Sequence, residues 1–119
     1  MKTRKRVLIV NCYFDELRIP IRRMTKYPQS MTAAYLAGIF YPGLCEIKLY
    51  DEVYSGPLES EALLSWSDML VLTGLNTAFD RMLHLTAYAR TKNRHVIVVA
   101  GGPAIRALPV YAKRFYNYC

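Results

Sequence analysis

Short runs of apolar residues alternate with amphipathic segments along much of the chain. Three runs, at residues 6–12 (RVLIVNC), 67–75 (SDMLVLTGL) and 95–102 (HVIVVAGG), are rich in branched apolar residues. Such continuous runs are typical of strands buried on both faces of a parallel sheet. Residues 45–53 (CEIKLYDEV) instead alternate apolar and polar positions. This alternation predicts a more exposed strand, nearer the edge of the sheet.

Apolar residues at helical spacing occupy the segments between these strands. In residues 30–40, Met31, Tyr35 and Ile39 recur four residues apart, with Ala34 and Gly38 beside them. We therefore expect a helix that packs closely through small residues. Residues 12–29 lack a clear period and contain two prolines, so we expect a long loop there.

Two more helical segments precede the last predicted strand, and a broken one follows it. Residues 59–66 predict a short helix, and residues 76–93 a longer one with a single packed stripe. Pro103 suits the first turn of a helix, because a missing N–H costs little there. Pro109 is expected to interrupt that helix and restart it. The packed stripe of the longer helix is Phe79, Met82, Leu83 and Thr86.

The order of these elements predicts an α/β fold. Strands that alternate with helices form right-handed parallel crossovers, with helices on both faces of the sheet. Because the second strand is the most polar, we expect the strand order 2-1-3-4 in a flavodoxin-like, doubly wound arrangement over residues 1–119. This arrangement normally has a fifth strand, which would begin at Tyr118 and Cys119. We therefore expect a fifth strand that is missing or supplied by another chain.

The composition argues against several classes of protein. The 119 residues include three cysteines, Cys12, Cys45 and Cys119, with no CxxC or CxxxCxxC spacing. This spacing argues against a zinc ribbon, a disulfide framework or an iron–sulfur cluster held within the chain. No apolar run approaches the roughly 18 residues of a membrane span, so we expect none.

Positive charge gathers in residues 2–6 and 22–26, and the formal net charge is +7. We interpret these clusters as solvated flanks, with an anionic ligand or partner surface as the alternative. They lack the motifs of RNA-recognition, helix-turn-helix and KH modules, so we do not expect a nucleic acid partner. Asn11 and the acidic residues 15–16 end the first apolar run too early for a secretory signal. The expected location is therefore the cytoplasm.

Three turns should converge where the buried strands end. In open parallel sheets, ligands bind beyond the carboxyl ends of the strands. Glycine lets backbone N–H groups approach a ligand, and the Thr73 hydroxyl adds a further polar group, so these turns could hold a phosphate or a flat ring. The alternative is that the two consecutive glycines only form a tight turn. The candidate binding residues are Asn11, Cys12 and Tyr13 after the first strand, Thr73, Gly74, Leu75 and Asn76 after the third, and Gly101, Gly102 and Pro103 after the fourth.

The same residues resemble a known family, the cobalamin-binding domains at the N-terminus of cobalamin-dependent radical SAM enzymes. The resemblance covers nearly the whole chain, in the segments RVLIVN, YPQSMTAAYLAGIF, KLYDEVY, MLVLTGLNT and VIVVAGGP. The wider corrinoid-binding family carries DxHxxG, SxL and GG motifs. Residues 73–75 are similar to SxL with threonine in place of serine, and residues 101–102 are similar to GG.

The resemblance implies a slot for the nucleotide tail of cobalamin, lined by the hydroxyl of SxL and the backbone of GG. The DxHxxG motif is absent, because the first strand is followed by NCYFDELRIP. Neither His84 nor His95 matches the lower cobalt ligand by motif, a departure that fits the radical SAM subgroup, which often binds cobalamin without that histidine. The turns at residues 12–15 and 75–76 would face the corrin. The Cys12 thiol could ligate cobalt, but we favour the alternative that Cys12 is only a small residue after a strand.

By this resemblance the chain cradles cobalamin for a radical SAM methyltransferase-like enzyme. The catalytic domain, with its iron–sulfur cluster and S-adenosylmethionine, would lie outside these residues and act in cis or in trans. Two alternatives remain open: a non-catalytic α/β interaction or regulatory module, and a module that binds a flavin nucleotide. Association of copies through the open sheet edge is also expected. The site predicts that Gly102→Val blocks cobalamin binding and leaves the fold intact.

Overall fold

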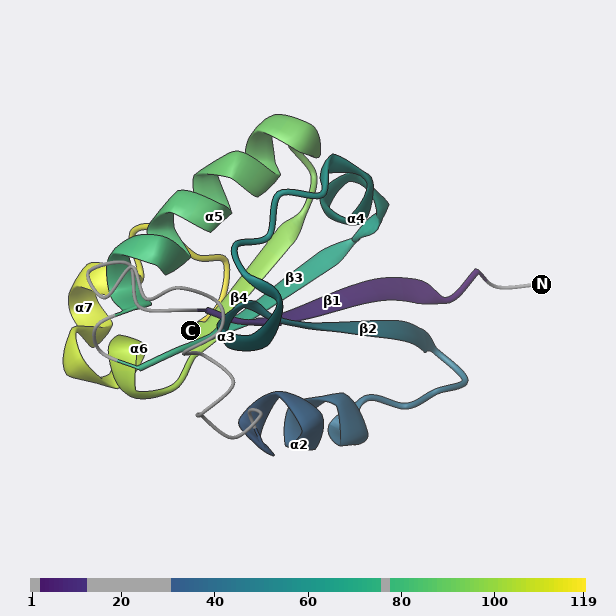
Figure 1. Ribbon diagram of the computed structural model, residues 1–119, viewed down its shortest axis with the longest axis horizontal. Helices are drawn as coiled ribbons and strands as arrows, with labels where there is room; N and C mark the ends of the chain where they lie inside the picture. The colour runs from purple at the N-terminus through teal and green to yellow at the C-terminus, as the bar shows by residue number, and fades with distance from the viewer. Residues whose placement is uncertain (1–2, 13–30, 76–77) are drawn as a thin grey trace.

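Four parallel strands form the centre of the molecule. The computed structural model describes residues 3–12, 31–75 and 78–119. Its strands β1 (Lys5–Asn11), β2 (Cys45–Asp51), β3 (Met69–Thr73) and β4 (Ile97–Gly101) make one sheet in the order β2-β1-β3-β4 (Figure 1). The predicted α/β class, the parallel pairing and the strand order are therefore confirmed. Apart from Cys12, the predicted loop at residues 12–29 lies outside the described residues.

Helices cover both faces of this sheet. Helix α2 (Met31–Ile39) lies against one face, while α4 (Glu61–Trp66) and α5 (Phe79–Lys92) lie on the other (Figure 1). Three shorter helices are α3 (Glu52–Ser55), α6 (Pro103–Ala107) and α7 (Pro109–Ala112). Pro103 opens α6 and Pro109 opens α7, so the predicted interruption is confirmed. None of the helices in the described part of the chain is long and apolar enough to cross a membrane.

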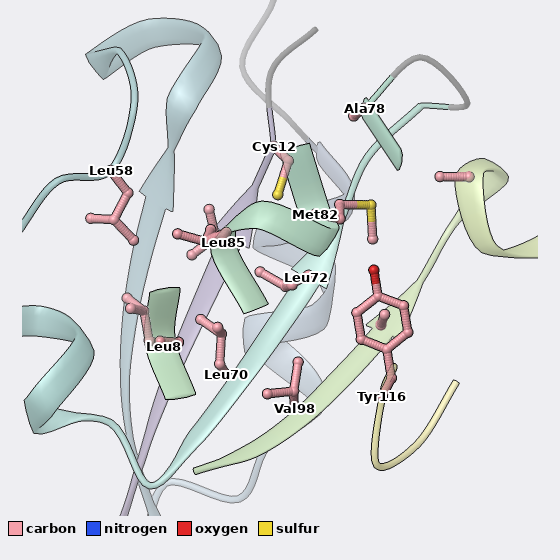
Figure 2. Close-up of a cluster of buried hydrophobic side chains, with 14 of the residues drawn as sticks. Leu8, Cys12, Leu58, Leu70, Leu72, Ala78, Met82, Leu85, Val98 and Tyr116 are labelled. Atoms are coloured by element: carbon pink, nitrogen blue, oxygen red, sulfur yellow. The ribbon is translucent and has the colours of Figure 1, made fainter. Parts of the chain in front are cut away.

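Side chains alternate across the sheet and divide the core in two. On the α5 side, Leu8, Leu70 and Val98 are fully buried and pack with the buried face of α5 (Figure 2). On the α2 side, Val7 and Val71 lie in a smaller cluster. Successive residues of a strand point to opposite faces of the sheet. In β1, β3 and β4 the even-numbered residues therefore face α5 and the odd-numbered residues face α2.

Helix α2 packs through a different face from the one we expected. The predicted small-residue contact through Ala34 and Gly38 is wrong, because both residues are exposed. The sheet is instead covered by Ala33, which is buried, and by the neighbouring side chains of the same cluster. Those neighbours are Leu36, Ala37 and Phe40. The physical reason is that α2 is apolar on both sides, so its period alone does not identify the inner face.

The second strand is shorter than predicted. It ends at Asp51, whose Oδ1 accepts a hydrogen bond from the Val53 N–H at 3.0 Å and so caps helix α3. An aspartate at this position satisfies a backbone donor that the first helical turn leaves open. Glu52 therefore begins a helix and becomes fully buried, where we had expected the strand to continue to residue 53.

The last residues lie beside β4, where the fifth strand of this architecture would begin. Tyr118 forms a parallel bridge with Val99, and the Ala100 N–H donates to the Tyr118 carbonyl at 3.0 Å. Asn117 holds this arrangement, because its Oδ1 accepts from the Val98 N–H at 2.8 Å and its own N–H donates to the Val98 carbonyl at 2.9 Å. The first part of the β4 edge is thus already paired.

Candidate functional site

One row of residues crosses the sheet at its carboxyl edge. Asp51 pairs in register with Asn11, Asn11 with Thr73, and Thr73 with Gly101. These four residues close their strands, and by the alternation of side chains they all belong to the α2 side of the sheet. The topology therefore brings two of the predicted motifs, around Thr73 and around Gly101, into direct register.

The amide of Asn11 is fixed by its neighbour in this row. Its Nδ2 donates to Asp51 Oδ1 at 3.0 Å, and the same oxygen accepts from the Val53 N–H at the start of α3. The carboxylate thus connects the end of β1 to the end of β2. This hydrogen bond orients the Asn11 amide, so that its oxygen is directed away from Asp51.

Gly102 is packed tightly against Thr73. Its φ of +97° lies in a region that side chains rarely adopt, and a Cβ there would stand 2.9 Å from Thr73 Oγ1 and 3.3 Å from the Gly74 carbonyl oxygen. The Ala104 N–H also donates to the Gly74 carbonyl at 3.3 Å. The turn after β4 therefore needs glycine at residue 102 for its backbone geometry. We expect Gly102→Val to strain and destabilise the fold, in contrast to the expectation from the sequence alone.

Gly74 is also explained by packing. A Cβ at this position would lie 2.8 Å from the Ala78 Cβ and 3.4 Å from the Met82 sulfur. These two residues belong to the start of α5, which crosses close over the end of β3. Glycine at this position thus allows the helix to approach the strand.

Gly101 differs from Gly74 and Gly102, the other two glycines of the motifs. A Cβ built on Gly101 would meet no heavy atom within 4 Å, and its φ lies outside the region that favours glycine. Neither a close approach within the described chain nor backbone strain requires glycine at this point. Its bare main chain is the part of the predicted site that packing does not account for.

The Cys12 thiol faces the core rather than the strand ends. The residue is 2% exposed, and its sulfur lies near Met82 and Leu85 (Figure 2). Burial raises the pKa of this thiol well above its usual value, so the group stays protonated. Its N–H donates to the Thr73 carbonyl at 2.8 Å and so joins β1 to β3. This placement argues against Cys12 as a cobalt ligand.

Two further candidate residues border the same edge. Leu75 and Pro103 are exposed, just beyond the ends of β3 and β4. Tyr13 and Asn76 lie outside the described residues.

Neither histidine belongs to the strand ends or turns at the carboxyl edge of the sheet. His84 lies on α5, where its Nδ1 is 3.1 Å from Arg81 Nη1, and His95 precedes β4 at the opposite edge of the sheet. Within residues 3–12, 31–75 and 78–119, no group of three potential metal-ligating side chains is found.

A buried ion pair beside the site has no clear signal in the sequence. Arg81 Nη2 donates to Glu52 Oε2 at 2.6 Å, and the same oxygen accepts from the Leu58 N–H at 2.6 Å. Both side chains are buried, with Glu52 fully so. The pair ties α3 and the loop after it to α5. Sequence reasoning missed it because residues 51 and 52 looked like parts of one continuing strand.

A hollow lies at the amino edge of the sheet, opposite the candidate site. It measures about 660 Å³ and its lining includes Lys5, Arg6, Asp68 and Lys92. Its positive charge is partly compensated, because Arg6 pairs with Asp68 at 3.3 Å and Lys92 pairs with the nearby Glu61 at 2.9 Å. This arrangement suits the solvated flank that we inferred for residues 2–6.

No family model, curated protein or solved structure matches this chain. Any function must therefore be argued from its residues and their arrangement.

Proposed function

We propose that this chain binds cobalamin at the carboxyl edge of its sheet and serves as the cofactor-binding module of a radical SAM methyltransferase-like enzyme. One observation carries the proposal. The motif that resembles SxL and the motif that resembles GG are separated by more than 20 residues in sequence, yet Thr73 and Gly101 pair in register on adjacent strands. Among the described residues, no heavy atom lies within 4 Å of the position where a Gly101 side chain would project.

The proposed roles follow from what each residue presents. Gly101 offers bare main chain against which a flat or extended group lies without a side chain between. Thr73 has its hydroxyl in the same row, where the residue is buried and packs against Gly102, and Asn11 has an amide whose direction is fixed by Asp51. Leu75 and Pro103 supply apolar rims on either side. These groups would hold the nucleotide tail of cobalamin by main-chain contact and a few hydrogen bonds.

The cobalt would receive no ligand from Cys12 or from the two histidines. The thiol is enclosed in the core, and the imidazoles belong to α5 and to the amino edge. The residues present thus fit a cobalamin that is held by its tail and corrin surface rather than through a histidine–cobalt bond. When bound, cobalamin supplies a cobalt that accepts and donates a methyl group.

Catalysis would require a second domain. We propose that a radical SAM domain, with an iron–sulfur cluster and S-adenosylmethionine, acts together with this chain in cis or in trans. In this arrangement the sheet edge presents the cofactor, and the other domain binds the substrate.

Titration with hydroxocobalamin tests the proposal. The full chain is titrated with difference absorption spectra, and the bound cofactor is counted by equilibrium dialysis. Gly101→Val is the decisive variant, because its side chain would project into the open space without striking the fold. Ala87→Val, on the exposed side of α5, is the matched control that adds two methyl groups elsewhere.

We expect saturable binding of cobalamin by the wild-type chain and by Ala87→Val. Gly101→Val should lose at least about tenfold in affinity, because the blocked contact is worth about 1.4 kcal/mol or more. Its thermal stability should be unchanged. Absence of binding by the wild-type chain refutes the cobalamin proposal. A parallel titration with flavin mononucleotide identifies the flavin alternative. Equal cobalamin affinity of Gly101→Val and Ala87→Val would show that the cofactor does not bind at Gly101.

A further inference from the structure

Helix α2 presents a large apolar surface to solvent. Met31, Tyr35 and Ile39 are 80%, 74% and 62% exposed, although each is a large apolar residue. Tyr41 and Leu44, in the turn that follows the helix, are also exposed. Single exposed apolar side chains are ordinary on protein surfaces, but a contiguous group of this size marks an interaction site.

The segment that carries this surface has no charged residue of its own, although Arg4 from the strand side donates a hydrogen bond to the Pro42 carbonyl at 3.3 Å. Residues 27–45 contain no Asp, Glu, Lys or Arg, although the whole chain carries a formal net charge of +7. The inner face of α2 is apolar as well, through Ala33 and its neighbours in the smaller core cluster. A helix that is apolar on both faces is typical of one that is buried on both faces. Among the described residues, the sheet covers only the inner face.

We infer that a second copy of this chain covers the outer face of α2, with the two helices antiparallel. The stripe of Met31, Tyr35 and Ile39 is symmetric about its central residue, since the outer two lie four positions to either side. A twofold axis near Tyr35 therefore places Met31 of one copy against Ile39 of the other and Tyr35 against itself. A twofold contact requires such a self-complementary surface.

Small residues beside the stripe allow the two helices to approach. Ala34 and Gly38 are exposed and lie next to Tyr35 and Ile39 on the helix surface. A Cβ on Gly38 would meet nothing within 4 Å, so this position is an open notch. The large side chains of one copy fit into the notch of the other, as ridges pack into grooves between helices.

The available area is sufficient for a stable contact. Five exposed large side chains, at roughly 100–200 Å² each, offer on the order of 700 Å² per copy, close to the roughly 800 Å² that each partner contributes to a standard interface. This contact is separate from the association expected through the sheet edge, because it uses the outer face of α2. Part of the β4 edge is already paired with Tyr118. The α2 contact uses none of the residues that we propose bind cobalamin.

The oligomeric state of the full chain tests the inference. Size-exclusion chromatography with light scattering, from about 5 to 500 μM, should show a concentration-dependent rise from 13.7 kDa toward twice that mass. Tyr35→Glu places a charge at the twofold axis and should raise the dissociation constant at least about tenfold. Val110→Glu, at a 77% exposed apolar residue on α7, is the matched control and should leave dimerisation unchanged.

Cysteine cross-linking tests the antiparallel arrangement. In a Cys119→Ser background, Tyr35→Cys should form an intermolecular disulfide on mild oxidation, as should the double variant Met31→Cys/Ile39→Cys. Met31→Cys alone should not, because its symmetry mate is distant in an antiparallel pair. A chain that stays monomeric at 500 μM, or a dimer that Tyr35→Glu and Val110→Glu weaken equally, overturns the inference. Cross-linking by Met31→Cys alone, without Tyr35→Cys, overturns the antiparallel arrangement.

Discussion

Gly102 and Thr73 approach so closely that a Cβ on the glycine would stand 2.9 Å from the threonine Oγ1. Gly101, one residue earlier, has open space at the same position. We predict that Gly102→Ala lowers the free energy of unfolding by about 1–3 kcal/mol, since it adds a crowded Cβ at positive φ. Gly101→Ala should change it by less than about 1 kcal/mol. Urea denaturation of both variants measures the difference, and equal losses would contradict the assigned roles.

The buried pair of Glu52 and Arg81 predicts a strong asymmetry between single and double variants. Arg81→Met should lower the free energy of unfolding by about 3–5 kcal/mol, because it leaves the Glu52 carboxylate buried without its main cation. Glu52→Gln/Arg81→Met should be less destabilised than Arg81→Met alone, since no uncompensated charge remains. A double-mutant cycle by chemical denaturation checks this coupling. Simple additivity of the two changes would show that the pair contributes little.

Tyr116 supplies a prediction at alkaline pH. Its hydroxyl points toward Met82 in the core and has no hydrogen-bond partner among the described residues (Figure 2). Burial is the main cause that raises the pKa of Tyr116 to about 12, from an ordinary value near 10. The folded chain therefore holds this proton more tightly than the unfolded chain, so the associated stability is complete below about pH 10 and is lost as the pH rises toward about 12.

Tyr116→Phe should remove this part of the alkaline destabilisation. Because the variant deletes a buried hydroxyl without a partner, we also expect it to be neutral or stabilising at pH 7. Thermal unfolding of both proteins between pH 7 and pH 12 provides the measurement. Parallel pH profiles for wild type and Tyr116→Phe would show that Tyr116 titrates normally.

Cys12 and Cys119 should differ widely in reactivity. Cys12 is buried and its pKa is raised by burial, while Cys119 is exposed. Iodoacetamide at pH 8 should therefore label Cys119 quickly and leave Cys12 unlabelled until the protein unfolds. Peptide mass spectrometry after timed labelling gives the result for each residue. Rapid labelling of Cys12 in the folded protein would reopen its role as a ligand at the strand ends.

The sequence was sufficient to predict the strands and their order, because continuous apolar runs and crossover connections leave few arrangements. It also predicted that the turns at Thr73 and Gly101 meet, since parallel strands end at one edge. It did not predict the inner face of α2, because both faces carry large apolar residues. Leu36 and Phe40 pack against the core, while Tyr35 and Ile39 are exposed.

The individual roles of the glycines were likewise beyond the sequence. Gly74 is crowded by α5 and Gly102 by β3, and both contacts come from a neighbouring element or strand. Only the folded arrangement separates these two from Gly101. The burial of Glu52 escaped prediction for a related reason, because its partner Arg81 lies 29 residues away.

The pairing of β1 with both β2 and β3 has a consequence for biosynthesis. Val7 meets Ile47 on one side and Met69 on the other, so neither ladder forms from residues that are close in the chain. Long loops must close before either pairing compensates for the lost entropy, which slows folding relative to helical proteins of similar size. On the ribosome, β1 therefore stays unpaired until β2 has emerged, and its other edge stays open until β3 follows. During that interval it is a target for chaperones.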